Sequence, residues 1–286
     1  MRFNRLGIML AAGMAMVVFS ALAASVAQAE EIKGPLWIVG SPGRGLLTGE
    51  TRSITSRSEG IYKLKTVGSP AVECNKVLNA GVLLGGSPGT AYTTITFKEC
   101  HLEGHEKCLA SGEKPLASPV NSGEVIVDAL AVLVYPEGST RSALLAFAPE
   151  GEPADTALFA EFKLLNQGEE RGEVGECGKL NEKKLEVNAT GSVIKVKSEE
   201  RRCGQLAQVG HTVEGDFVLS QPGEKARVGL LQLPSEVITK AEWWNGEKYE
   251  KIECKLESKG GFAGKASEVG TSIIETIPAE EFGWNL

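Results

Sequence analysis

Residues 72–108 read VECNKVLNAGVLLGGSPGTAYTTITFKECHLEGHEKC and hold three of the six cysteines. From Thr93 to Phe97, polar or small side chains alternate with Ile95 and Phe97, which is the period of a strand with one buried face. Upstream, the apolar run Ala80–Leu84 ends at Gly85-Gly86-Ser87-Pro88-Gly89, where proline and glycine favour a tight turn. The stretch therefore predicts a strand, a turn and a second strand.

The same turn matches G-x-S-x-G, the sequence of the nucleophile elbow in serine hydrolases. In that elbow the residue after the serine donates its backbone N–H to the oxyanion hole. Here that residue is Pro88, which has no N–H to donate. The tetrad Gly-Ser-Pro-Gly also occurs at residues 40–43. We interpret it as a repeated turn sequence and not as a catalytic motif.

Cys100, His101, His105 and Cys108 offer two thiolates and two imidazoles, the donor types of a tetrahedral zinc site. Their spacing matches no established zinc pattern. Paired cysteines around a short polar loop are more often a disulfide in an oxidising compartment. We expect a bridge here, with two solvated histidines in the loop.

Six cysteines allow 15 pairings. Our first expectation joins Cys100 to Cys108, Cys74 to Cys177, and Cys203 to Cys254. The spacing from Cys74 to Cys100 equals that from Cys177 to Cys203, which hints at a duplication. A true repeat would instead join Cys74 to Cys100, Cys177 to Cys203, and Cys108 to Cys254.

The amino terminus has the pattern of a secretory signal. A basic start with Arg2 and Arg5 precedes an apolar segment, and Ala27-Gln28-Ala29 provides a cleavage site of the A-x-A type. We predict a signal peptide over residues 1–29, a secreted region over 30–286, and no membrane span after cleavage. The location is therefore extracellular or associated with the cell envelope.

Composition narrows the fold and the partners. Removal of the two signal arginines changes the net charge from −7 to −9. This charge argues against nucleic acid as a partner, because phosphate binding requires clustered Lys and Arg. Frequent Gly and Pro indicate many turns between short strands. The fold class is all-β, with two packed, mainly antiparallel sheets stapled by disulfides, and with a boundary near 149–153 that allows two similar halves.

Other segments agree with this fold class. Glu124–Tyr135 is the longest apolar run after the signal, and its valines and flanking turns favour a strand over a helix. Leu185–Lys197 reads as one strand, or as two around Gly191. In Tyr249–Leu256, apolar residues alternate with lysine and glutamate, as in a strand with one solvated face.

The best candidate for ligand binding is the segment from Trp243 to Tyr249. Asn245-Gly246 predicts a two-residue hairpin turn, which would pair Trp244 with Glu247. Adjacent tryptophans would then lie on opposite faces, one in the core and one exposed. An exposed tryptophan, with Tyr249 nearby, could stack on a sugar or anchor a protein. The alternative is that Lys248 or a loop covers it.

Several motifs together support a resemblance. They are the signal sequence, the segment around Cys74, Gly89-Thr90 leading to Thr96-Phe97-Lys98-Glu99-Cys100, Lys107-Cys108, Cys177-Gly178, and Thr190-Gly191-Ser192-Val193-Ile194. The chain resembles uncharacterised secreted β-rich proteins of soil-dwelling Gram-positive bacteria. The resemblance implies an extracellular setting and brings no functional residues with it.

The sequence thus predicts a non-enzymatic extracellular or envelope-associated protein that binds a cell-wall glycan or a surface protein. It contains no catalytic constellation that we can defend, and no pattern in it calls for a cofactor or a metal. The alternative is a secreted hydrolase acting on polysaccharide, in which two carboxylates would flank the scissile bond.

Overall fold

A computed structural model describes residues 34–40, 44–112, 123–150, 156–167, 175–235 and 238–286. Ile32–Leu286 forms one compact unit. Within the described residues, strands account for nearly all regular structure, and the one helical element is the 3-10 turn Gly178–Leu180. The predicted all-β fold with packed antiparallel sheets is confirmed. The predicted signal peptide at 1–29 lies outside the described residues.

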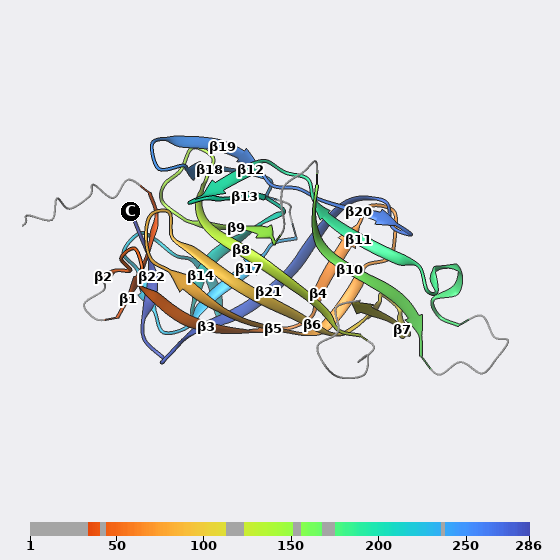
Figure 1. Ribbon diagram of the computed structural model, residues 1–286. Helices are drawn as coiled ribbons and strands as arrows, with labels where there is room; N and C mark the ends of the chain where they lie inside the picture. The colour runs from red at the N-terminus through yellow and green to blue at the C-terminus, as the bar shows by residue number, and fades with distance from the viewer. Residues whose placement is uncertain (1–33, 41–43, 113–122, 151–155, 168–174, 236–237) are drawn as a thin grey trace, which may run out of the picture. The chain divides into compact units, whose positions relative to one another are not determined.

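One closed ring of antiparallel strands organises the molecule (Figure 1). Each member hydrogen-bonds to the next, and the last pairs with the first, so the ring has no free edge. In order around the ring, the strands are β3 (Thr51–Ser58), β5 (Val72–Leu84), β6 (Thr90–Leu102), β8 (Val125–Pro136), β9 (Leu144–Pro149), β14 (Gln205–Val213), β17 (Gly229–Leu233) and β21 (Gly264–Ile277).

A second closed ring uses the same long strands β5, β6 and β21. These strands are 13 to 14 residues long, so one part of each belongs to the first ring and the other part to the second. The remaining members are β4 (Tyr62–Thr66), β7 (His105–Gly112), β10 (Ala157–Asn166), β11 (Lys184–Ala189) and β20 (Leu256–Gly260).

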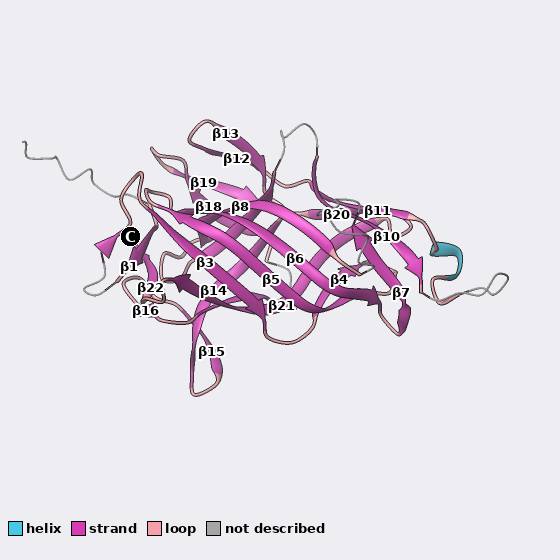
Figure 2. Cartoon of the chain, turned by 60° about the horizontal axis from the view of Figure 1, so that its bottom comes forward, coloured by secondary structure: helices cyan, strands magenta, loops and turns pink. Residues whose placement is uncertain are grey.

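Two hairpins cover the outer face of the first ring. They are β12 (Val193–Val196) with β13 (Glu199–Arg202), and β18 (Lys240–Trp244) with β19 (Tyr249–Glu253). They lie on the same side of the molecule in both views (Figure 2). Their apolar side chains and those of β8, β9 and β14 form a second core outside the ring. This layer explains the apolar run at 124–135, because β8 is buried on both faces from Ala129 to Tyr135.

The remaining short strands form a separate four-stranded sheet: β1 (Leu36–Val39), β2 (Arg44–Gly45), β16 (Lys225–Ala226) and β22 (Phe282–Asn285). Trp37 of β1 donates its indole N–H to the carbonyl oxygen of Thr90 at 2.9 Å. β15 (Asp216–Leu219) pairs antiparallel with the end of β14, and the two form a hairpin. In the part of the chain that is described, no helix is both long and apolar enough to cross a bilayer.

The strand expectations need two refinements. Leu185–Lys197 contains two strands, β11 and β12, on either side of Gly191. Tyr249–Leu256 is not one strand, because β19 ends at Glu253 and β20 begins at Leu256, and the two pair with different neighbours. Of the expected boundary near 149–153, residues 151–155 lie outside the described chain. Strands from before and after it pair directly, as β9 does with β14.

The cysteine pairing takes one bridge from each expectation, and its third bridge was in neither. Disulfides join Cys74 to Cys100, Cys108 to Cys177, and Cys203 to Cys254. The expected Cys100–Cys108 and Cys74–Cys177 bridges are therefore wrong, as are the Cys177–Cys203 and Cys108–Cys254 bridges of the repeat. The reason is register: Cys74 of β5 lies directly opposite Cys100 of β6, with the Cα atoms 4.0 Å apart.

Candidate functional site

A broad hollow opens beside the two hairpins. It has a volume of about 670 Å³ and lies where three segments meet: the turn Gly85–Pro88 between β5 and β6, the β12–β13 hairpin, and the tip of the β18–β19 hairpin. We call it the tryptophan groove, because Trp243 and Trp244 both line it. Its size falls within the range of small-molecule sites.

The hairpin that carries the tryptophans has its turn one residue further along than expected. Trp244 pairs with Tyr249, so the predicted pairing of Trp244 with Glu247 is wrong. The backbone N–H of Asn245 donates to the carbonyl oxygen of Lys248 at 3.1 Å, which places Gly246 and Glu247 at the centre of the turn. The Asn245 Oδ1 accepts hydrogen bonds from the backbone N–H groups of Glu247 and Lys248 at 2.8 and 2.9 Å and supports this turn.

The tryptophans lie on opposite faces of β18, but neither is exposed. Trp243 belongs to the second core and is 4% exposed; Trp244 is 7% exposed. The expectation of one exposed tryptophan is therefore wrong. On one face of β18, the Tyr249 ring lies 5.0 Å from the Trp244 ring. On the opposite face, β12 of the β12–β13 hairpin contributes to the same core as Trp243. The tryptophans form a rigid base, since only small parts of their rings are open to solvent.

Tyr249 supports this base without lining the groove. Its ring also lies 5.6 Å from that of Tyr135, which is fully buried. Burial is the main cause that raises the pKa of both phenols, so both stay protonated at physiological pH. We therefore place Tyr249 behind Trp244 as a packing residue.

Polar side chains form the rim. Asn245 donates from its Nδ2 to Glu250 at 2.7 Å, while Lys195 lies 3.6 Å from Glu200 across the β12–β13 hairpin. Lys197 adds a further cation. The groove thus combines an aromatic base with hydrogen-bonding side chains that are positively charged, negatively charged or neutral. This combination suits a polyhydroxylated ligand, because sugars present apolar C–H faces and many hydroxyl groups.

The sequence motifs that resemble catalytic or metal sites have clear positions in the fold. Ser87 lies in the expected turn, and the strand β6 follows it where a nucleophile elbow would begin a helix. Cys100 and Cys108 belong to different disulfides, so neither provides a thiolate to the adjacent histidines. Among the described residues, no three His, Cys, Asp or Glu side chains gather as metal ligands.

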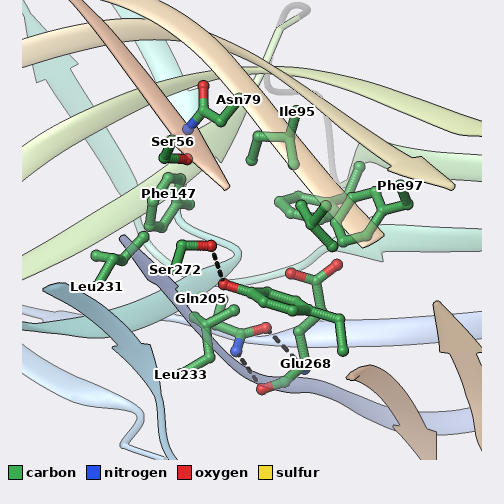
Figure 3. A pocket seen from close by; sticks show the side chains of 13 residues that line it. Ser56, Asn79, Ile95, Phe97, Phe147, Gln205, Leu231, Leu233, Glu268 and Ser272 are labelled. Atoms are coloured by element: carbon green, nitrogen blue, oxygen red, sulfur yellow. Dashed lines mark hydrogen bonds between the residues drawn. The ribbon is translucent and has the colours of Figure 1, made fainter. Parts of the chain in front are cut away.

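An acidic residue inside the rings was missed by the sequence-based predictions. Glu268 of β21 lines a cavity of about 20 Å³ together with Phe97, Phe147 and Tyr62, and its carboxyl group points toward Phe97 (Figure 3). Such a volume holds about one water molecule. Burial raises the pKa of Glu268 to about 7. Nearby, the hydroxyl groups of Tyr62 and Ser272 share a hydrogen bond of 2.5 Å.

Gln205 holds the backbone of this acid in place. Its Nε2 donates to the carbonyl oxygen of Glu268 at 2.7 Å, and its Oε1 accepts the N–H of Glu268 at 2.9 Å (Figure 3). Glu268 has the same strand parity as Ala266, Ser272 and Thr276, all of which are buried, but Ser272 and Thr276 are polar, so no apolar pattern in the sequence marked this face as inward.

Neither a protein-family model nor a curated protein nor a solved structure matches this chain.

Proposed function

We propose that the protein is a secreted, non-enzymatic binding protein that holds a carbohydrate of the cell envelope in the tryptophan groove. The observation that carries the proposal is the groove itself, where three segments distant in sequence bring a rigid aromatic base and a mixed polar rim together. A concave site of this size fits a chain of sugars better than the flat surface of a folded protein.

The disulfides support the extracellular part of the proposal. All six cysteines are paired, and disulfides persist mainly in oxidising compartments. Sequencing the amino terminus of protein recovered from the culture medium tests secretion directly. A start at Glu30 supports both secretion and the expected cleavage site. Recovery only from the cytoplasm, with residues 1–29 retained, would overturn this part.

A cell-wall pull-down followed by a glycan array tests binding. The informative variants change exposed or half-buried rim residues, because the buried tryptophans also support the fold. Glu250→Gln removes the negative charge of the rim while keeping an oxygen that can accept from Asn245, and Lys195→Ala removes a cation from the opposite wall. Each should weaken binding about threefold to tenfold. Lys259→Ala, an exposed change on β20, is the matched control and should bind as the wild type does.

The polysaccharide hydrolase remains the second candidate, because Glu200 and Glu250 line the same groove from opposite hairpins. Two carboxylates that flank a glycosidic bond are the usual catalytic pair of such enzymes. Release of reducing ends from a bound glycan, abolished in both Glu200→Gln and Glu250→Gln, would favour the hydrolase. Binding without release favours the binding protein, and absence of binding to any glycan would reject both.

A further inference from the structure

A second hollow opens where β21 changes its neighbour. On one edge, β21 pairs with β20 up to Ala266 and with β17 from Gly270 onward. Hydrogen bonds on one edge of a strand come from alternate residues, so Glu268 is the residue left between the two partners. The side-chain amide of Gln205 occupies that place. The Gln205 side chain therefore pairs with both backbone groups of Glu268 at the point where the sheet divides.

The hollow at this fork has a volume of about 500 Å³, and we call it the fork cleft. Val67 and Ile238 line it, together with Gln205 and Cys254; Leu256 and Ala266 border it as well, but their side chains are buried in the main core. The disulfide from Cys254 to Cys203 fixes this wall to the start of β14. The inner surface is therefore mostly apolar and held by a covalent link, as in sites for small organic ligands.

Lysines gather at the mouth of the fork cleft. Lys65 of β4 pairs directly with Ser267 of β21, so both side chains lie on the same face. Lys255 lies on the other flank of Ser267, because the next residue, Leu256, pairs with Ala266. Lys265 is the third lysine at the mouth. Ser267 is thus flanked by lysine residues from two different strands.

The charges at the mouth do not cancel. Lys255 lies 3.0 Å from Glu253, and Lys265 faces Glu257 in the register of β20 and β21. Among the described residues no salt bridge to Lys65 is formed, and the acid that its charge reaches, Glu103, is held by Lys63 at 3.1 Å. One positive charge therefore remains beside the Ser267 hydroxyl, at the entrance to an apolar hollow.

We propose that the fork cleft binds a small organic acid with one carboxylate on an apolar body. The carboxylate accepts hydrogen bonds from Lys65 and Ser267, while the body packs on Val67 and Ile238, the accessible apolar side chains of the same hollow. Apolar contact supplies most of the affinity, and the single charge selects an anion over a neutral molecule. This site is separate from the tryptophan groove, and the two share no lining residue.

Benzoate is a suitable probe, with benzyl alcohol as the neutral match and inorganic phosphate as the anion without an apolar body. Amide chemical shifts of the full protein are followed by NMR during titration at low salt. We expect saturable shifts for benzoate at Ser267 and Lys255. Benzyl alcohol and phosphate should each bind more weakly by about fivefold or more, because each lacks one of the two interactions.

Lys65→Ala should weaken benzoate binding about twofold to fivefold, and salt at about 0.5 M should produce a similar loss in the wild type. Lys259→Ala removes an exposed lysine of β20 that lines neither hollow and serves as the control, with unchanged benzoate binding. Equal affinity for benzyl alcohol or phosphate, an unaltered Lys65→Ala variant, or shifts confined to residues around Trp243 would each overturn the proposal. The full fold of Lys65→Ala is checked by its amide spectrum.

Discussion

At the scale of single residues, Glu268 makes the stability of the protein depend on pH. Its carboxyl group is buried among aromatic rings, and burial raises its pKa from 4.5 to about 7. The folded state therefore holds the proton more tightly than the unfolded state does. The resulting stabilisation is complete below about pH 4.5 and is lost as the pH rises through 7. Tyr62 is the titratable neighbour, and its own raised pKa keeps it neutral throughout this range.

Glu268→Gln should remove this dependence. The amide keeps the size of the side chain but cannot ionise, so the variant should gain stability over the wild type as the pH increases from about 5 to about 8. The gain should reach roughly 3 kcal/mol, because the pKa of Glu268 rises from 4.5 to about 7 on folding. Urea unfolding across this pH range measures the difference. Glu257→Gln, an exposed change on β20, is the control. The prediction would be contradicted if the free energies of unfolding of the wild type and of Glu268→Gln changed in parallel with pH.

Gln205 replaces a strand at the fork, so its loss should be costly. Gln205→Ala leaves the N–H and C=O of Glu268 without partners in a mostly buried place. We expect a loss of about 2–4 kcal/mol in the free energy of unfolding. Hydrogen exchange gives a local readout, since the amide of Glu268 should lose protection before its neighbours do. Gln208→Ala, further along β14, is the comparison, and unchanged exchange at Glu268 would show that Gln205 is not its partner.

At the scale of elements, Asn245 decides the shape of the β18–β19 hairpin. Asn245→Ala removes the acceptor for two backbone N–H groups and should destabilise the protein by about 1–2 kcal/mol. Asn245→Asp keeps that acceptor but places a second carboxylate beside Glu250. It should retain the turn and still weaken ligand binding in the groove. Thermal unfolding and glycan binding separate these effects, and equal stability of the two variants would count against this account of the turn.

The sequence indicates some elements well and others poorly, for a physical reason. β6 is evident because Ile95 and Phe97 alternate with polar residues. β21 is not evident, since its inward positions include Glu268, Ser272 and Thr276, which are buried yet polar. β3 is equally obscure, because its sequence TRSITSRS contains a single apolar residue, Ile54. These strands are held by neighbours on both sides, so backbone pairing compensates for a weak apolar pattern.

The parts of the tryptophan groove also differ in how well the sequence predicts them. The tryptophan hairpin could be found from Asn245-Gly246 and its flanking residues, because a hairpin is a local structure. The other two walls of the groove could not, since residues 85–88 and 193–200 come to it only through the order of strands in the sheet. That order also decides which faces are covered. This is why Trp243 and Trp244 are both buried.

At the scale of the whole molecule, the disulfides reinforce a sheet that already closes on itself. The Cys74–Cys100 bridge joins residues that the β5–β6 register already places opposite each other. The Cys108–Cys177 bridge closes a loop of 69 residues and connects β7 to the segment that follows β10. A long loop restricts the unfolded chain more than a short one does. The second bridge should therefore contribute more to stability than the first.

Replacing both members of a pair with serine tests this order. Cys108→Ser with Cys177→Ser should lower the free energy of unfolding by about 4 kcal/mol, and Cys74→Ser with Cys100→Ser should lower it by about 3 kcal/mol. Urea unfolding measures both, and mapping of disulfide-linked peptides in the wild type confirms the pairing. Free thiol in the denatured wild-type protein would contradict the three bridges. Because pairing around the rings stays intact, both variants should remain folded and retain the β-sheet circular dichroism of the wild type.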